Sequence, residues 1–379
     1  MNSVAAKSGF FKRLRKLTPL RAAWTFIVGM GSGTANTLAD FVRLFSDLTG
    51  EHICYKPFHD RLSNASFPEF LRRLCETFMS ELIGPTLHVR RGKLKAFDDI
   101  WIQDGTSFAL NDRLAKQFPG RFTRISLAAA EVHCTYSLLE GQVIAVAVAP
   151  DSQAERDFLP DPQEVSGKLL LLDRGYVSYS YFDALDTNDA HYICRAKDKN
   201  ISPEIVECYE GFARPSSIAG RTLGNVRIPK KTVDLIIVGK RKGGKWQKRG
   251  GSCRLRLVIF WVAKAKKHVY LFTNLARCDF SPAAVASAYR LRWQIELFFK
   301  ECKSYTKLTK FQTADPHITE GLIWASLIAV LFRRYLTYEA HAGAGSRSAR
   351  SRRCCRPRPS TGSTAAPGSP GTCDAGASP

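Results

Sequence analysis

The first part of the chain, residues 1–92, places apolar residues three and four positions apart. The segments FVRLFSDLTG, YKPFHDRLSN and FPEFLRRLCETFMSELI show this spacing, which predicts amphipathic helices. Residues 40–65, around Gly50, match either the plain packing of a helix bundle or a helix-turn-helix. The second motif would present the side chains of Lys56, His59 and Arg61.

From Phe97 onward the spacing changes to the alternation that is typical of β-strands. FDDIWIQDGTSFAL alternates apolar and polar residues, and AAAEVHCTYSLLEGQVIAVAVAP has the form of a hairpin that turns at residues 140–141. GKLLLLDRGY contains a continuous apolar run, which predicts a central strand buried on both faces. The first and the last of these strands each lead into an aspartate, Asp104 and Asp173.

The remaining body of the chain returns from strands to helices. Residues 195–275 are β-rich and contain the basic, glycine-rich turn KRKGGKWQKRGG. Helical spacing follows over residues 281–304 and 316–338. Strands that are preceded and followed by helices place the chain in the α/β class.

The net charge indicates the kind of binding partner. Lys and Arg number 56 against 34 Asp and Glu, which gives a formal net charge of +22. Such an excess calls for an anionic partner, and nucleic acid is the leading candidate. A membrane is the alternative, but the apolar run over residues 22–30 is too short to span one. The charge therefore favours a nucleic-acid-binding protein, with no membrane partner.

The distribution of the cysteines indicates the redox conditions of the cellular compartment. The chain has 11 of them, spread singly apart from three near the C-terminus, with no CxxC pair. This distribution argues against a disulfide framework and against a zinc site. A reducing cytoplasm fits it best.

Four reactive polar residues lie close together in YRLRWQIELFFKECKS, residues 289–304: Tyr289, Arg292, Glu296 and Lys303. At about 100° per residue, they fall inside a sector about 60° wide on one face of a helix. That face borders an apolar stripe fit for a core. Periodicity alone leaves two interpretations, a surface face with an Arg292–Glu296 salt bridge or one wall of an active site.

Three carboxylates form the candidate metal site. Asp104 ends or interrupts the first strand, Asp173 lies at the C-terminal end of the buried strand, and Glu296 lies on the polar edge of the late helix. Carboxylates in this arrangement hold two divalent ions, which relieve the repulsion between the acids. Hard oxygen ligands favour Mg²⁺ or Mn²⁺ over zinc, and such sites act on phosphodiesters.

The motifs DGTS at Asp104, LLLDRGY at Asp173 and Y-x2-R-x3-E-x6-K over residues 289–303 resemble those of the insertion-sequence DDE transposases with the Tyr-Arg-Glu-Lys signature. The resemblance covers about residues 35–338. It implies a ribonuclease H-like domain, that is, a mixed sheet flanked by helices with a β-rich insertion before Glu296. It also implies cut-and-paste movement through nicking, a DNA hairpin, hairpin opening and strand transfer. The catalytic and Mg²⁺-binding triad, in which Mn²⁺ would substitute, would be Asp104, Asp173 and Glu296.

The same resemblance implies that three signature residues hold terminal phosphates and the strained hairpin: Tyr289, Arg292 and Lys303. Lys300 is a further candidate for a DNA contact, as is Arg174, for which a turn at the strand end is the alternative. Trp246, in the basic turn, is a candidate platform for a flipped base. An exposed or packed aromatic residue in a hairpin is the alternative there.

The sequence thus predicts four parts: an N-terminal helical domain that is a candidate for DNA binding (1–92), a ribonuclease H-like catalytic domain (93–195 and 276–340), a β-rich insertion (196–275) and a tail (341–379). The tail from Ala342 has no Leu, Ile, Val or aromatic residue, so it cannot build a core and is expected to be disordered. Family members usually continue with apolar helical sequence at this point. One hypothesis is an out-of-frame reading of a GC-rich gene, and the other is an arginine-rich arm for DNA.

The predicted function is therefore that of a bacterial DNA transposase. We expect it to act as a homodimer on double-stranded DNA, at the terminal inverted repeats of its own element, in the cytoplasm and in association with the nucleoid. Two rivals stay open. A copy impaired by its C-terminus would only bind the element ends, and a structure-selective nuclease on the same fold would have no terminal repeats.

Overall fold

The structure is a computed structural model that describes residues 1–11, 15–81, 92–196, 203–239, 253–306 and 313–354. The chain divides into two compact units, Met1–Leu336 and Thr337–Pro379. Among the described residues, no helix is both long enough and apolar enough to cross a membrane. The sheet and the site described below lie in the first unit.

The N-terminal region is helical, as the apolar spacing predicted. Its helices are α1 (Asn2–Ser8), α2 (Pro19–Ser32), α3 (Leu38–Thr49), α4 (Tyr55–Leu62) and α5 (Ser66–Glu81). The sequence fixes their ends locally: the Thr18 side chain accepts a hydrogen bond at the start of α2, and Thr37 with Asp40 forms a capping box on α3. The helices pack through buried phenylalanines, which include Phe26, Phe41, Phe45, Phe67 and Phe70.

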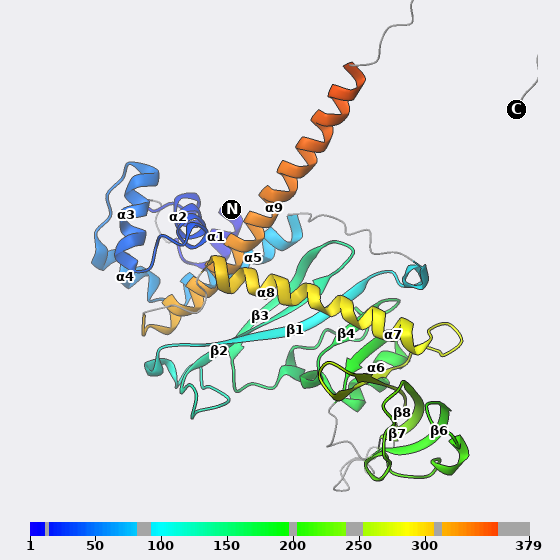
Figure 1. The fold of residues 1–379 in the computed structure, drawn as a ribbon. Helices are drawn as coiled ribbons and strands as arrows, with labels where there is room; N and C mark the ends of the chain where they lie inside the picture. The colour runs from blue at the N-terminus through cyan, green and yellow to red at the C-terminus, as the bar shows by residue number, and fades with distance from the viewer. Residues whose placement is uncertain (12–14, 82–91, 197–202, 240–252, 307–312, 355–379) are drawn as a thin grey trace, which may run out of the picture. The chain divides into compact units, whose positions relative to one another are not determined.

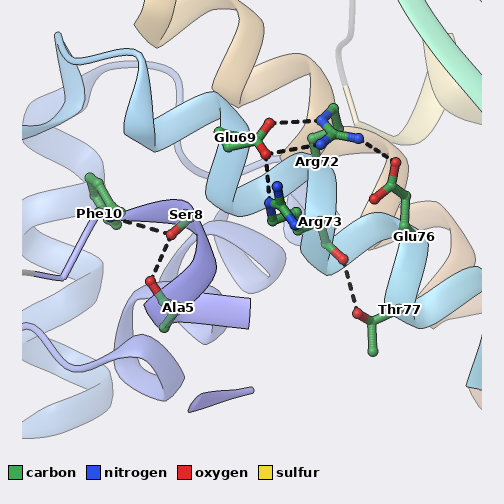
Figure 2. A network of polar contacts seen from close by, with 8 residues as sticks. All are labelled: Ala5, Ser8, Phe10, Glu69, Arg72, Arg73, Glu76 and Thr77. Carbon is green, nitrogen blue, oxygen red and sulfur yellow. Dashed lines mark hydrogen bonds and ion pairs between the residues drawn. The ribbon is translucent and has the colours of Figure 1, made fainter. Parts of the chain in front are cut away.

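Charged side chains along α5 form a local network (Figure 2). Arg72 donates to the two carboxylate oxygens of Glu69 at 2.8 and 2.9 Å and also pairs with Glu76, while Arg73 donates to Glu69. The Arg72 guanidinium holds the pKa of Glu69 below its usual range. Because Arg72 and Glu69 are 34% and 32% exposed, each such pair contributes only about 0.2–0.5 kcal/mol.

Residues 40–65 include one basic side chain that packs inward. Arg61, which a helix-turn-helix would present, lies over the rings of Phe10 and Phe11, with its guanidinium carbon 5.5 and 5.6 Å from their centroids. Burial lowers the pKa of Arg61. Lys56, on the same helix, is exposed. At least one of the three candidate DNA contacts of this region therefore serves packing.

The described strands form a nine-stranded mixed sheet (Figure 1). In spatial order they are β3 (Gln142–Pro150), β2 (Ala129–Ser137), β1 (Ile100–Ala109), β4 (Leu169–Leu172), β5 (His191–Arg195), β9 (Lys267–Thr273), β8 (Cys253–Val262), β7 (Val233–Gly239) and β6 (Glu204–Glu210). The pairs β1–β4 and β4–β5 are parallel, and the other pairs are antiparallel. Strands β6 to β9, from the predicted insertion, extend this same sheet. The predicted ribonuclease H-like α/β class, a mixed sheet flanked by helices, is confirmed.

Strand β4 is buried on both faces, as its apolar run predicted. Its residues Leu169–Leu172 are all 0% exposed. Leu169 and Leu171 belong to the core that includes the N-terminal helices, and Leu170 and Leu172 belong to the core beneath α6 (Tyr179–Thr187). Two cores therefore hold the end of β4, where Asp173 follows.

The last helices of the first unit pack against the face of the sheet that carries Ile100 and Ile102 of β1 (Figure 1). They are α7 (Pro282–Tyr289), α8 (Trp293–Tyr305) and the start of α9 (Pro316–Cys354). Short 3₁₀ helices connect the larger elements: η1 (Gly92–Ala96), η2 (Asp112–Leu114), η3 (Glu155–Phe158), η4 (Arg174–Tyr176), η5 (Pro215–Ser217), η6 (Leu223–Asn225) and η8 (Arg290–Arg292). Helix α9 continues beyond its predicted end at 338, and the last part of the predicted tail, residues 355–379, lies outside the described residues.

Candidate active site

The two aspartates lie side by side: Asp104 lies within β1, which continues past it, and Asp173 directly follows the parallel strand β4. Gln103 of β1 pairs with Leu172 of β4, so Asp104 and Asp173, the next residues along, occupy adjacent positions. The Oδ1 atom of Asp104 accepts a hydrogen bond from the backbone N–H of Gly105 at 2.9 Å. The parallel register thus brings together two residues that are 69 positions apart in the sequence (173 − 104).

Helix α8 brings the third carboxylate to the same place. Arg292 donates one hydrogen bond to Asp104 Oδ2, at 2.5 Å, and another to Glu296. The Tyr289 hydroxyl donates to Asp173 Oδ1 at 3.4 Å. The structure therefore gathers the predicted triad together with two of the predicted phosphate-binding residues.

The helix face differs in one respect from the predicted one. The expected continuous helix over 281–304 is interrupted at residues 290–292, where the 3₁₀ turn η8 joins α7 to α8. The Arg292–Glu296 salt bridge of the rival interpretation does form, but the Arg292 side chain is only 13% exposed and has Asp104 as a second partner. The pair is therefore part of the acidic site and is not an isolated surface pair.

Burial and charge set the protonation of the site. Burial, with smaller contributions from the neighbouring Asp173 and Glu296, raises the pKa of Asp104 to about 6 against the opposing effect of Arg292. Burial alone would lower the pKa of Arg292, but the surrounding acids, Asp104 above all, raise it overall. Arg292 therefore stays charged, whereas the raised pKa of Asp104 brings its protonation closer to neutral pH.

The other predicted DNA contacts that the structure describes are Lys303, Lys300 and Arg174. Lys303 donates from Nζ to the carbonyl oxygen of Ser107 on β1 at 3.1 Å, and burial lowers its pKa. Lys300 on α8 and Arg174 in η4 are exposed. Trp246 lies outside the described residues.

One basic residue near the site was not predicted. Cys194 of β5 pairs with Leu172 of β4, so Arg195 lies next to Asp173 in the same row. Its Nη1 atom is 4.0 Å from Asp173 Oδ1, and its side chain is 34% exposed. A signal was available in the sequence: the segment HYICR ends in a cation, just as IWIQD and LLLLD end in acids.

The donor set suits a hard divalent cation. Within the described part of the chain, no group of three or more His, Cys, Asp or Glu side chains is close enough together to hold a metal ion. Instead, the Arg292 guanidinium lies between Asp104 and Glu296 and supplies the compensating positive charge. The ligands on offer are carboxylate oxygens, which Mg²⁺ and Mn²⁺ prefer. The Arg292 guanidinium is thus the positive charge that this acidic site already contains. The carboxylate oxygens of the site are suitable ligands for a divalent metal ion.

Comparison with known proteins gives a family match. Residues 95–332 match the model of the transposase DDE domain. The chain is 25% identical over 366 residues to the transposase for insertion sequence element IS231B of Bacillus thuringiensis subsp. berliner, covering 87% of this chain and 75% of the relative. It is 23% identical over 379 residues to the transposase for IS1151 of Clostridium perfringens, covering 89% and 78%.

Two further similarities are more limited. Over 74 residues the chain is 40% identical to the putative transposase InsL for IS186A of Escherichia coli K12, which covers 20% of each protein. The cryo-EM structure of a piggyBac transposase synaptic complex with hairpin DNA aligns with a TM-score of 0.40 and 12% identity, over 95% of this chain and 82% of that chain.

Proposed function

The chain belongs to the DDE transposase family, and we propose that it moves its own insertion sequence by cut-and-paste, through a hairpin intermediate. The observation that carries this proposal is the gathering of Asp104, Asp173 and Glu296 around Arg292. The substrate is double-stranded DNA at the terminal inverted repeats. A basic chain of +22 has the charge that binding of this polyanion requires.

Membership of this family implies a divalent metal, and we propose Mg²⁺, with Mn²⁺ as a substitute. Asp104, Asp173 and Glu296 would hold it. When bound, the metal would activate the attacking oxygen and stabilise the leaving oxygen of the phosphodiester. The neighbouring carboxylates need compensating positive charge, which Arg292 supplies in part.

The cations around the triad orient DNA. Arg292 has a planar guanidinium with several donors, so it can bond a phosphate while it still contacts a carboxylate. Tyr289 holds Asp173 through its hydroxyl, and burial raises the pKa of that hydroxyl, so Tyr289 stays a neutral donor. Lys303 and Arg195 flank the row of acids and add phosphate contacts on either side.

We propose DNA contacts for three further residues. Lys300 and Arg174 are exposed and would neutralise backbone phosphates. Trp246, in its basic turn, would stack on a base flipped out during hairpin formation. A homodimer on DNA, in the bacterial cytoplasm at the nucleoid, would bring two element ends together.

The test is cleavage of a DNA fragment that carries the gene and its flanks, with Mg²⁺ or Mn²⁺ present. We expect breaks at both element ends with the wild type, none with Asp104→Ala, and normal breaks with the matched control Asp112→Ala. Asp112 is an exposed acid in η2, just past the end of β1. Protection of the ends without breaks would mean a DNA-binding protein without catalysis, and breaks within structured DNA but not at the ends would mean a nuclease.

A further inference from the structure

A carboxylate touches the backbone beside each of the two aspartates. Gly105 directly follows the first aspartate, and Gly175 comes two residues after the second. A Cβ atom added to Gly105 would lie 2.6 Å from Glu131 Oε1, and one added to Gly175 would lie 1.4 Å from Glu155 Oε2. These motif glycines, Gly105 and Gly175, therefore leave the space that the two carboxylates occupy.

A single guanidinium joins these carboxylates. Arg121 donates from Nη2 to Glu131 Oε2 at 3.0 Å and from Nη1 to Glu155 Oε1 at 2.5 Å. Asp151 in turn holds the arginine: its carboxylate accepts from the backbone N–H of Arg121 at 2.8 Å, and its carbonyl accepts from Nε at 3.0 Å. Arg121, Glu131 and Glu155, which we call the clamp, come from three separate segments, namely a loop, β2 and η3.

A second set of contacts fixes the same elements. His133 of β2 stacks on Phe158 of η3, with ring centroids 3.8 Å apart. The Nδ1 atom of His133 lies 3.5 Å from the hydroxyl of Tyr176 in η4, the turn that follows the second aspartate. These contacts hold η3 and η4 against β2 without the help of Arg121. Loss of the clamp should therefore displace the backbone near the aspartates without unfolding the region.

We propose that Arg121 is a positioning residue that fixes the spacing of Asp104 and Asp173 through the clamp. It acts from outside the triad, because strand residues alternate between the two faces of a sheet and Glu131 lies on the face of Gly105. Without the guanidinium, Glu131 and Glu155 lose the donor that they share, so nothing joins them against the motif glycines. A shift of about 1 Å in a catalytic group lowers a rate about 100-fold.

The experiment compares Arg121→Ala with Arg124→Ala, an exposed arginine three residues further along the same loop. It measures Mn²⁺ affinity of the full chain by calorimetric titration, affinity for the element end, and the single-turnover rate of end cleavage at saturating protein. We expect Arg121→Ala to weaken Mn²⁺ binding and to slow cleavage about 100-fold at unchanged DNA affinity. Arg121→Lys should recover only part of the rate, because one ammonium cannot bond both carboxylates as the planar fork does. Arg124→Ala should match the wild type.

A double variant gives a second test of whether the clamp residues act together. If the clamp acts as a unit, Arg121→Ala combined with Glu155→Ala should cleave no more slowly than the slower single variant. If Arg121→Ala does not fold, Glu155→Gln carries the same test, since it keeps the shape and removes the charge of one clamp member.

The outcomes separate this proposal from the function on which it rests. Wild-type Mn²⁺ affinity and cleavage in Arg121→Ala would overturn the positioning role, as would an equal loss in Arg124→Ala or independent effects in the double variant. A wild-type chain that binds Mn²⁺ but cleaves no element end would contradict the proposed function, and the Mn²⁺ affinities would then decide the role of Arg121. A wild type that neither binds Mn²⁺ nor cleaves would overturn both.

Discussion

Removal of Arg292 should leave a signature in the pH dependence of stability. Its guanidinium lies between Asp104 and Glu296, and the side chain is 13% exposed. In Arg292→Ala the two carboxylates remain without the cation that lies between them. Burial raises the pKa of Asp104 to about 6 and Arg292 opposes that rise, so loss of Arg292 should raise this pKa further.

The direction of the pH effect follows from the difference in the Asp104 pKa between the folded and the unfolded chain. The Asp104 carboxyl has a higher pKa in the folded chain than in the unfolded chain, so it favours folding fully below about pH 4 and loses that effect as the pH rises through the folded value. In the wild type the loss is nearly complete just above pH 6, and in Arg292→Ala it should continue to higher pH.

The expected magnitude comes from the burial of the pair. Breaking a buried ion pair costs about 3–5 kcal/mol, but Glu296 is 32% exposed and water partly compensates. We therefore expect Arg292→Ala to lower the free energy of unfolding by about 2–3 kcal/mol near pH 7.5. Near pH 4.5, where Asp104 is protonated in both proteins, the loss should be below about 1 kcal/mol.

The assay is urea unfolding at both pH values, in the presence of a chelator. Arg290→Ala is the matched control, because Arg290 lies in the same 3₁₀ turn, is exposed and donates to Ser287. Addition of Mn²⁺ near pH 7.5 should restore part of the stability of Arg292→Ala, since the ion binds the folded acids. An equal loss at both pH values, or a loss no larger than in Arg290→Ala, would refute this reasoning.

Two further predictions concern the core and the DNA contacts. Leu171→Ala, at a 0% exposed position of β4, should lower the free energy of unfolding by about 2–5 kcal/mol in chemical denaturation, whereas Leu297→Ala, at a side chain 39% exposed on α8, should cost less than about 1 kcal/mol. Lys303→Gln should weaken binding to the element end and reduce the slope of log affinity against log salt concentration by about 1, as measured by fluorescence anisotropy. An unchanged slope would mean that Lys303 serves only its contact with Ser107.

The adjacency of the two aspartates could be predicted from the sequence because it depends on simple patterns. The run Leu169–Leu172 is apolar without alternation, which indicates a strand covered on both faces, and such strands are mostly parallel. Asp173 directly follows this strand, and Asp104 lies at the adjacent position of β1, its parallel neighbour. The family, too, could be predicted from the spacing of its motifs, and the match over residues 95–332 confirms it.

The turn at residues 290–292 could not be predicted in the same way. A helical wheel assumes an unbroken helix, and no Gly or Pro in this stretch signals a break. The tightening to a 3₁₀ turn accompanies the contact of Arg292 with Asp104, which joins residues 188 positions apart in the sequence. Helix propensity depends on the local sequence and not on such contacts, so it could not predict the turn.

The clamp could not be predicted from the sequence either. Arg121, Glu131 and Glu155 are spread over 35 positions, and no periodicity connects them. Glu155 begins η3, and its carboxylate accepts a hydrogen bond from Arg121, which a local pattern does not show. The glycines of DGTS and LLLDRGY were the available signal, but the space that a glycine leaves beside the backbone becomes meaningful only when its occupant is known.

The most direct test of the central claim, that these carboxylates form a metal site for DNA cleavage, is a metal-switch measurement on Asp173→Cys. The single-turnover rate of cleavage at the element end would be measured for the wild type and the variant, in Mg²⁺ and in Mn²⁺. A thiolate is a poorer ligand for Mg²⁺ than for softer ions, so the account predicts that Asp173→Cys is inactive in Mg²⁺ and recovers part of its activity in Mn²⁺. Cleavage by Asp173→Cys at the wild-type rate in Mg²⁺ would contradict it.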